Sequence, residues 1–95
     1  MKKEILERLE REVKACKRYA EGSIKKAKEG KIKSAINLLD IAQTAKTCSD
    51  QLHEELWKQS QGNLNEEEFE LFCKSETLDR EIKKAYKELN IARQR

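Results

Sequence analysis

Asp50 and His53 are the residues whose types and spacing come nearest to a metal-binding or acid–base site. Three residues apart on a helix, they share a face, so both side chains can reach one ion. However, His53 is the only histidine of the chain, and a protein metal centre normally needs three or four ligands. We therefore expect no metal site and no cofactor.

Cys16, Cys48 and Cys73 are the candidate nucleophiles. Cys48 and His53 are five residues apart, which separates them by about 140° around a helix and prevents a Cys–His pair. The chain has no glycine-rich phosphate loop and no G-x-S-x-G motif. An odd number of cysteines without metal-like spacing indicates free thiols in a reducing compartment. We expect no catalytic residues, so the protein is not predicted to be an enzyme.

A lysine cluster surrounds Gly30 in the stretch KKAKEGKIK, residues 25–33. Lysines that precede the glycine are favourable at a helix C-terminus, each by about 0.3–1 kcal/mol, because they face the negative end of the helix dipole. Lys31 and Lys33 follow the glycine and stand at a helix N-terminus, where positive charge is mildly unfavourable. The cluster is therefore either a solvated helix corner or a contact site for an acidic group, which free N–H groups would also help to bind.

Three long helices are predicted to carry these residues. The first spans residues 2–29, with acid-before-base pairs four residues apart on its outer face and an apolar seam in steps of three and four. Gly30 ends it, since glycine readily adopts the left-handed conformation found after helices. The seam consists of Leu6, Leu9, Val13, Cys16, Ala20, Ser23 and Ala27.

The second helix is predicted over residues 31–59 and the third over residues 66–93. The stretch AINLLDIAQTA is apolar around most of the second helix, which predicts a place in the middle of the bundle. Asn65 and Glu68 form a capping-box pattern that begins the third helix. Ser75 and Thr77 favour caps over helix interiors, so the third helix can be kinked near them. Short turns then predict one domain, residues 1–95: an all-α, up-down-up antiparallel three-helix bundle.

Charge is strongly segregated along the chain, although the net charge is only +3. Residues 1–34 carry a net +6, residues 35–78 a net −6, and residues 79–95 a net +3. Antiparallel packing predicts an acidic end, made of Asp50, Glu54, Glu55, Glu66, Glu67, Glu68 and Glu70. It also predicts a basic end, made of Lys25, Lys26, Lys28, Lys31, Lys33, Lys83, Lys84, Lys87, Arg93 and Arg95.

Trp57 is the only tryptophan and has two interpretations. It lies 18 residues, or five helical turns, after Leu39, which places both on one face of the second helix. It can plug the end of the bundle beneath residues 60–64, or it can be an exposed anchor for a partner.

The first helical hairpin resembles those of tetratricopeptide repeats and of microtubule-interacting-and-transport (MIT) domains. The resemblance covers residues 19–45: Gly30 in the turn, then Ile32, Ala35 and Ala42, with Tyr19 near the aromatic position of the first helix. A second repeat is absent, and the helices are about twice the usual repeat length. The resemblance implies a domain that binds proteins, often as peptides or helices laid in a groove, and it assigns no binding residues.

Two functions remain as hypotheses. The first is a non-enzymatic module for protein interaction or for self-association, for example as a homodimer, whose basic end contacts an acidic partner. The second is a small nucleic-acid-binding or nucleoprotein-accessory protein, since several phosphate contacts could come from the basic end. No stretch is apolar enough to span a membrane and no signal peptide is recognised, so we expect a cytoplasmic protein without a membrane partner.

Overall fold

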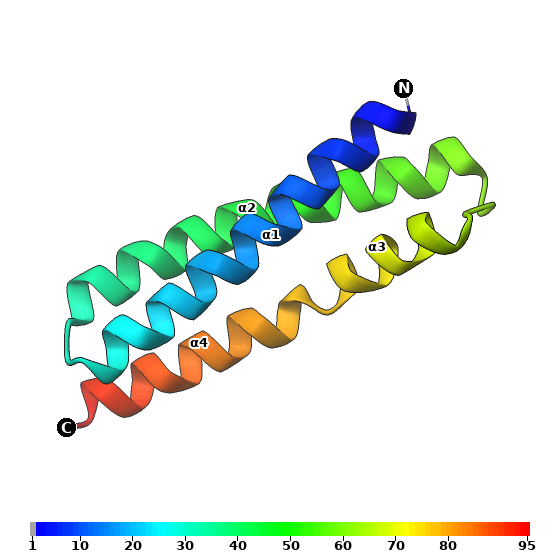
Figure 1. Cartoon of the computed structure of the whole chain (residues 1–95). Helices are drawn as coiled ribbons and strands as arrows, with labels where there is room; N and C mark the ends of the chain where they lie inside the picture. The colour runs from blue at the N-terminus through cyan, green and yellow to red at the C-terminus, as the bar shows by residue number, and fades with distance from the viewer. Residues whose placement is uncertain (1) are drawn as a thin grey trace.

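The computed structural model describes residues 2–95 as four α-helices: α1 (Lys2–Lys28), α2 (Ile32–Ser60), α3 (Glu66–Glu76) and α4 (Leu78–Arg93). α1 and α2 run antiparallel, and α3 and α4 together form the third limb, which runs in the same direction as α1 (Figure 1). The all-α, three-helix bundle predicted from the sequence is confirmed. The first two helix boundaries agree with the prediction to within one residue.

The turn between α1 and α2 follows from its glycine. Gly30 has φ +79°, and its N–H donates to the Ala27 carbonyl at 3.0 Å. The Lys31 N–H reaches back to the Lys26 carbonyl at 2.9 Å, which completes a Schellman motif. Gly22 lies eight residues before this turn. A Cβ at Gly22 would lie 3.4 Å from the Leu38 side chain, so α2 packs closely against this glycine. The two helices therefore form a tight antiparallel hairpin.

The buried residues are those of the predicted apolar seams, except at the start of α1, where the buried position is shifted by one residue. Leu9, Val13, Cys16, Ala20, Ser23 and Ala27 are buried as predicted. Ile5 is buried in place of Leu6, which is only half-buried. The third limb buries Ser75, Leu78, Ile82, Ala85 and Leu89.

The central position predicted for α2 is wrong. All three limbs pack against one another, and Ile41 on α2 is 45% exposed. The apolar arc of α2 is thus wider than the area its neighbours cover.

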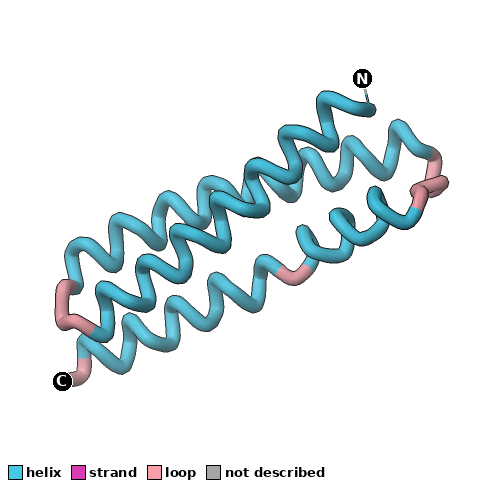
Figure 2. Tube along the Cα trace, viewed as in Figure 1, coloured by secondary structure: helices cyan, strands magenta, loops and turns pink. Residues whose placement is uncertain are grey.

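The third limb breaks at Thr77, where Figure 2 shows a short loop between α3 and α4. The Thr77 hydroxyl donates to the Lys74 carbonyl at 2.8 Å, and a side chain that hydrogen-bonds the backbone in this way competes with the regular helix ladder. At the other end of α3 the capping box is present. The Glu68 N–H donates to Asn65 Oδ1, and the Asn65 N–H donates to Glu68 Oε1, both at 2.9 Å. α3 is therefore a separate helix of 11 residues, with a capping box at its N-terminus and the Thr77 interruption at its C-terminus.

The molecule is a rod of 49 × 17 × 16 Å. The α1–α2 turn and the C-terminus lie at one end of the rod, and the α2–α3 loop and the start of α1 lie at the other (Figure 1). This is the topology on which the predicted separation of charge depends. Within residues 2–95, no helix is long and apolar enough to cross a membrane.

Candidate interaction surfaces

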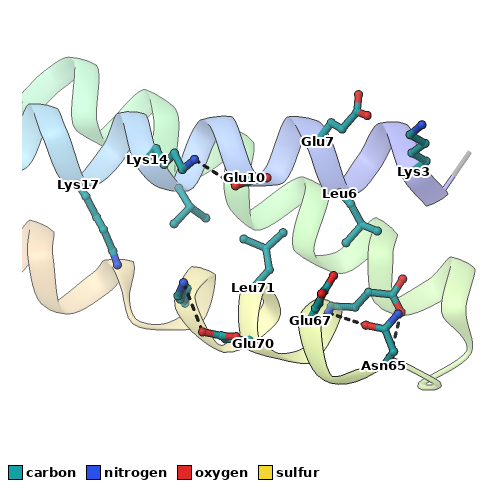
Figure 3. A pocket seen from close by; sticks show the side chains of 13 residues that line it. Lys3, Leu6, Glu7, Glu10, Lys14, Lys17, Asn65, Glu67, Glu70 and Leu71 are labelled. Atoms are coloured by element: carbon teal, nitrogen blue, oxygen red, sulfur yellow. Dashed lines mark hydrogen bonds and ion pairs between the residues drawn. The ribbon is translucent and has the colours of Figure 1, made fainter.

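A groove of about 450 Å³ runs between α1 and α3 (Figure 3). Leu6 from α1 and Leu71 from α3 point toward one another across it, and Val13 also lines it. This explains why Leu6 is not in the core: it faces the groove, where α3 does not cover it. Leu6 and Leu71 are half-buried and give the groove its solvent-facing apolar surface, whereas Val13 is buried. Charged residues border the groove.

One end of the groove is held by polar contacts between the two helix starts. Lys2 Nζ lies 3.0 Å from a Glu68 carboxylate oxygen, which joins α1 to α3. The hydrogen bond from the Asn65 backbone and the contact with Lys2 both lower the pKa of Glu68. Glu68 is thus ionised at neutral pH, and it acts in both the helix cap and the contact between the helices.

The charges that border the groove change sign along its length. Near the start of α1 they are mainly carboxylates, and further along they are lysines. α1 and α3 run in the same direction, so the first turns of both helices lie at one end of the groove and later turns lie toward the other end (Figure 3). The acidic part contains Glu7, Glu10, Glu67 and Glu70 together with Lys3, and the basic part contains Lys14, Lys17 and Lys74.

The lysines predicted around Gly30 lie at the end of the rod that also holds the C-terminus (Figure 1). Lys25, Lys26 and Lys28 occupy the last turn of α1. Lys31 is the N-cap residue of α2 without a side-chain cap bond, and its Nζ lies 3.7 Å from a Glu29 oxygen. Lys33 is exposed in the first turn of α2. Glu29 therefore balances part of the charge on Lys31.

Lys83, Lys84 and Lys87 line a shallow depression on α4, together with Arg80 and Glu81. Lys83 pairs with Asp79 at 3.0 Å. Lys83 precedes Arg93 by ten residues, or about 15 Å of helix, so the basic surface extends along α4 rather than stopping at the tip. Arg80 was missed by the sequence analysis, although its spacing to Lys83, Lys84 and Lys87 places all four on one helical face.

Trp57 is 48% exposed and belongs to an aromatic cluster at the opposite end of the rod. Its ring centroid lies 5.4 Å from that of Phe72, and its edge packs against Gly62 in the α2–α3 loop. Phe72 also stacks on His53 at 3.6 Å and contacts Phe69 at 6.4 Å. This cluster was not predicted. Its only sequence signal is that His53 and Trp57 are four residues apart and Phe69 and Phe72 three apart, so that each pair lies on one helical face.

Trp57 does not share the environment of Leu39, which is 2% exposed. The buried positions of α2 repeat close to every 3.5 residues, as Ala35, Ala42, Ser49 and Leu56 do. Over 18 residues, that period and a period of 3.6 diverge by about 50°. Leu56 therefore takes the buried position, and Trp57 turns outward.

His53 links α2 to α3 through hydrogen bonding. Ser75 Oγ donates to the Phe72 carbonyl at 2.9 Å, so it accepts a hydrogen bond from His53 Nδ1. His53 Nε2 lies 3.7 Å from a Glu76 oxygen. Burial lowers the pKa of His53 more than Glu76 and Asp50 raise it, so the ring is neutral at pH 7.

The described residues contain no group of three or more side chains able to hold a metal ion. Cys16 is buried, and burial raises the pKa of its thiol to about 11, which leaves it without thiolate character at neutral pH. Cys48 and Cys73 are free and half-buried. Comparison with protein-family models, curated proteins and solved structures finds no match for this chain.

Proposed function

We propose that the protein is a non-enzymatic interaction module that binds a helix of a partner protein in the groove between α1 and α3. The observation that supports this is the groove itself: Leu6 and Leu71 face one another between two helices, the buried Val13 also lines the groove, and charged side chains border it on both sides. An amphipathic helix laid in such a groove buries its apolar face and pairs its polar flanks. The partner helix would complete a four-helix arrangement.

The borders of the groove define the chemistry of the partner helix. The α1 side extends from Lys3 to Lys17, about 21 Å, which corresponds to roughly four helical turns. Apolar residues at positions i, i+3 and i+7 of the partner helix would lie on one face and pack against the apolar side chains of the groove. Glu10 pairs with Lys14 at 3.1 Å and Glu70 with Lys74 at 3.6 Å. Lysine or arginine at one end of the partner would therefore face Glu7 and Glu67, and glutamate or aspartate at the other end would face Lys17.

The basic end adds attraction for an acidic partner. The lysines of the groove lie at the groove end that is nearer to the basic end of the rod (Figure 1). An acidic surface of the partner can therefore contact both the groove lysines and the basic end. Exposed lysines on the rim of an interface mainly raise the association rate and make it depend on salt. The double variant Lys31→Glu, Lys33→Glu should therefore slow association and weaken its salt dependence, while dissociation changes little.

A designed peptide tests the groove. The probe is a blocked helix of about 14 residues with leucines at i, i+3 and i+7, lysines flanking the first and glutamates flanking the last. Calorimetric titration should give binding to the wild-type protein that falls at least about tenfold in Leu71→Lys, which puts a charge among the apolar side chains of the groove. Ile41→Lys is the matched control, because Ile41 is an exposed apolar residue that does not line this groove.

Equal binding by the wild type and by Leu71→Lys would contradict the proposal. Absence of binding at roughly 1 mM peptide, an affinity too weak for recognition, would also contradict it. Far-UV circular dichroism on both variants establishes that they are folded.

A nucleic-acid role is the second candidate, and the depression on α4 is the observation that favours it. Arg80, Lys83, Lys84 and Lys87 present four cations on one helical face, a pattern that can follow a phosphate backbone. Gel-shift titration with single- and double-stranded DNA and RNA at low salt should then show binding that Arg80→Glu with Lys84→Glu abolishes. If none of the four nucleic acids shifts at high micromolar protein, this candidate is excluded.

A further inference from the structure

The aromatic residues of this protein lie outside its core. Of the five, Trp57, Phe69 and Tyr86 are exposed, and Tyr19 and Phe72 are half-buried. Large aromatic side chains normally contribute most when buried, so their exposure in a small bundle indicates a binding surface. Trp57, Phe69 and Phe72 are contiguous through the ring contacts of Phe72, and they form what we call the aromatic face.

Two carboxylates without a cationic partner border the aromatic face. Glu66 and Glu76 stand three residues before and seven residues after Phe69, which places them on the same side of α3. Among residues 2–95, no lysine or arginine lies within ion-pairing distance of either, and Glu76 contacts only the neutral His53. On α2, in contrast, Asp50 and Glu54 are paired with Lys46 at 2.9 Å and Lys58 at 3.2 Å.

We propose that the aromatic face binds an arginine-rich segment of a partner protein. A guanidinium group is planar and weakly hydrated, so it can stack on the Trp57 and Phe69 rings and donate to a carboxylate in the same plane. Glu66 and Glu76 supply those carboxylates at the border of the rings. Lysine, a compact and strongly hydrated charge, satisfies the carboxylates but uses the rings less well.

Other occupants fit the surface less well. Nucleic acid would be repelled by the carboxylates, and a purely apolar helix would leave them without a counter-charge. A second copy of the chain could offer its basic end, but that end consists mainly of lysines, which use the rings less well than guanidinium groups do. An arginine-rich segment of another protein is the occupant that matches both the rings and the charge.

Trp57 provides a direct readout, because it is the only tryptophan and lies within the aromatic face. The probes are blocked octa-arginine, octa-lysine and octa-glutamate, titrated against the whole chain while Trp57 emission and calorimetric heat are recorded. Octa-arginine should bind and change the emission, octa-lysine should bind several-fold more weakly, and octa-glutamate should leave the emission unchanged. Phe69→Ala, and separately Glu66→Gln with Glu76→Gln, should each weaken octa-arginine binding by about tenfold.

Tyr86→Ala is the matched control, because it removes an exposed aromatic residue from α4, outside the aromatic face. Equal affinities for octa-arginine and octa-lysine, or octa-arginine binding unaffected by Phe69→Ala, would overturn the proposal and leave only general attraction to the acidic end. Trp57 emission that depends on protein concentration alone would assign the surface to a second copy. Leu6→Gln, which removes an apolar side chain from the groove on α1 without adding a charge, should weaken the amphipathic peptide but leave octa-arginine binding unchanged, so this proposal and the proposed function fail separately.

Discussion

Serine residues occupy buried seam positions, and they differ in how their hydroxyls are satisfied. Ser23 Oγ donates to the Ala35 carbonyl at 2.7 Å and so joins α1 to α2 close to the turn. Ser49 is fully buried, and its Oγ has no hydrogen-bond partner among residues 2–95. A buried hydroxyl without a partner is unfavourable by about 1–3 kcal/mol, because it loses its hydrogen bonds to water. These two serines therefore have opposite effects on stability.

Ser49→Ala should raise the free energy of unfolding by about 1 kcal/mol, since it removes the unsatisfied hydroxyl from a site where alanine fits and favours helix. Ser23→Ala should lower it by about 1 kcal/mol, because a buried hydrogen bond between helices is lost. Urea denaturation of both variants measures the difference. A Ser49→Ala protein less stable than the wild type would show that the hydroxyl is satisfied in solution.

His53 should make stability depend on pH in a defined window. Its pKa is lowered from the ordinary value of 6.5 in the folded protein, mainly by burial, so the unfolded chain binds the proton first as pH falls. The contribution of His53 to stability is therefore fully present above pH 6.5 and decreases as pH falls toward the pKa of the folded state. His53→Gln should remove this decrease, which begins as pH falls below about 6.5.

Urea midpoints of the wild type and of His53→Gln, measured across this range, test the prediction. The relevant charges around His53 are Glu76 and Asp50, both of which raise its pKa and so oppose the effect of burial. A wild-type stability that increases as pH falls through this window would mean that these carboxylates dominate.

At the scale of the element, α3 is the segment on which both proposed surfaces depend. It is only 11 residues long, and isolated helices of that length are marginal in water. Its capping box, its ion pair with Lys2 and the His53–Ser75 hydrogen bond hold it in place. The shape of the groove and of the aromatic face therefore depends on these polar contacts together with the packing of Leu71 and Phe72 against the core.

Asn65→Ala should lower the free energy of unfolding by about 1 kcal/mol, the typical effect of removing a helix N-cap. Because the cap belongs to α3, amide hydrogen exchange should accelerate first in residues 66–76, while α1 and α2 stay protected. Asn63→Ala, in the loop before α3, is the matched control and should change neither quantity. Uniform acceleration of exchange along the chain would show that α3 unfolds only together with the whole bundle.

Some elements could be predicted from the sequence because their causes are local. The Gly30 turn, the Asn65–Glu68 capping box and the interruption near Thr77 each depend on residues within a few positions of one another. The groove could not be predicted in this way, because its opening depends on how far α3 lies from α1. The same applies to Ile5 replacing Leu6, and Trp57 was misplaced because a small error in helical period grows over 18 residues.

At the scale of the whole molecule, the basic surface and the acidic and aromatic surfaces lie at opposite ends of the rod. The basic end surrounds the α1–α2 turn and the C-terminus, whereas the aromatic face and the acidic part of the groove lie toward the opposite end (Figure 1). Charges this far apart exceed the screening length of about 8 Å at physiological salt, so the basic end is electrostatically independent of the opposite end. The groove and the aromatic face share α3 and therefore are not independent of each other.

Binding of a partner helix in the groove is the central proposal, and amide chemical-shift mapping with the designed amphipathic peptide tests it most directly. The account predicts that shifts change along α1 between residues 3 and 17 and along α3 between residues 65 and 74, the two sides of the groove. Changes confined to the α1–α2 turn and α4, with α1 and α3 unaffected, would contradict it and would leave the basic surface as the binding site.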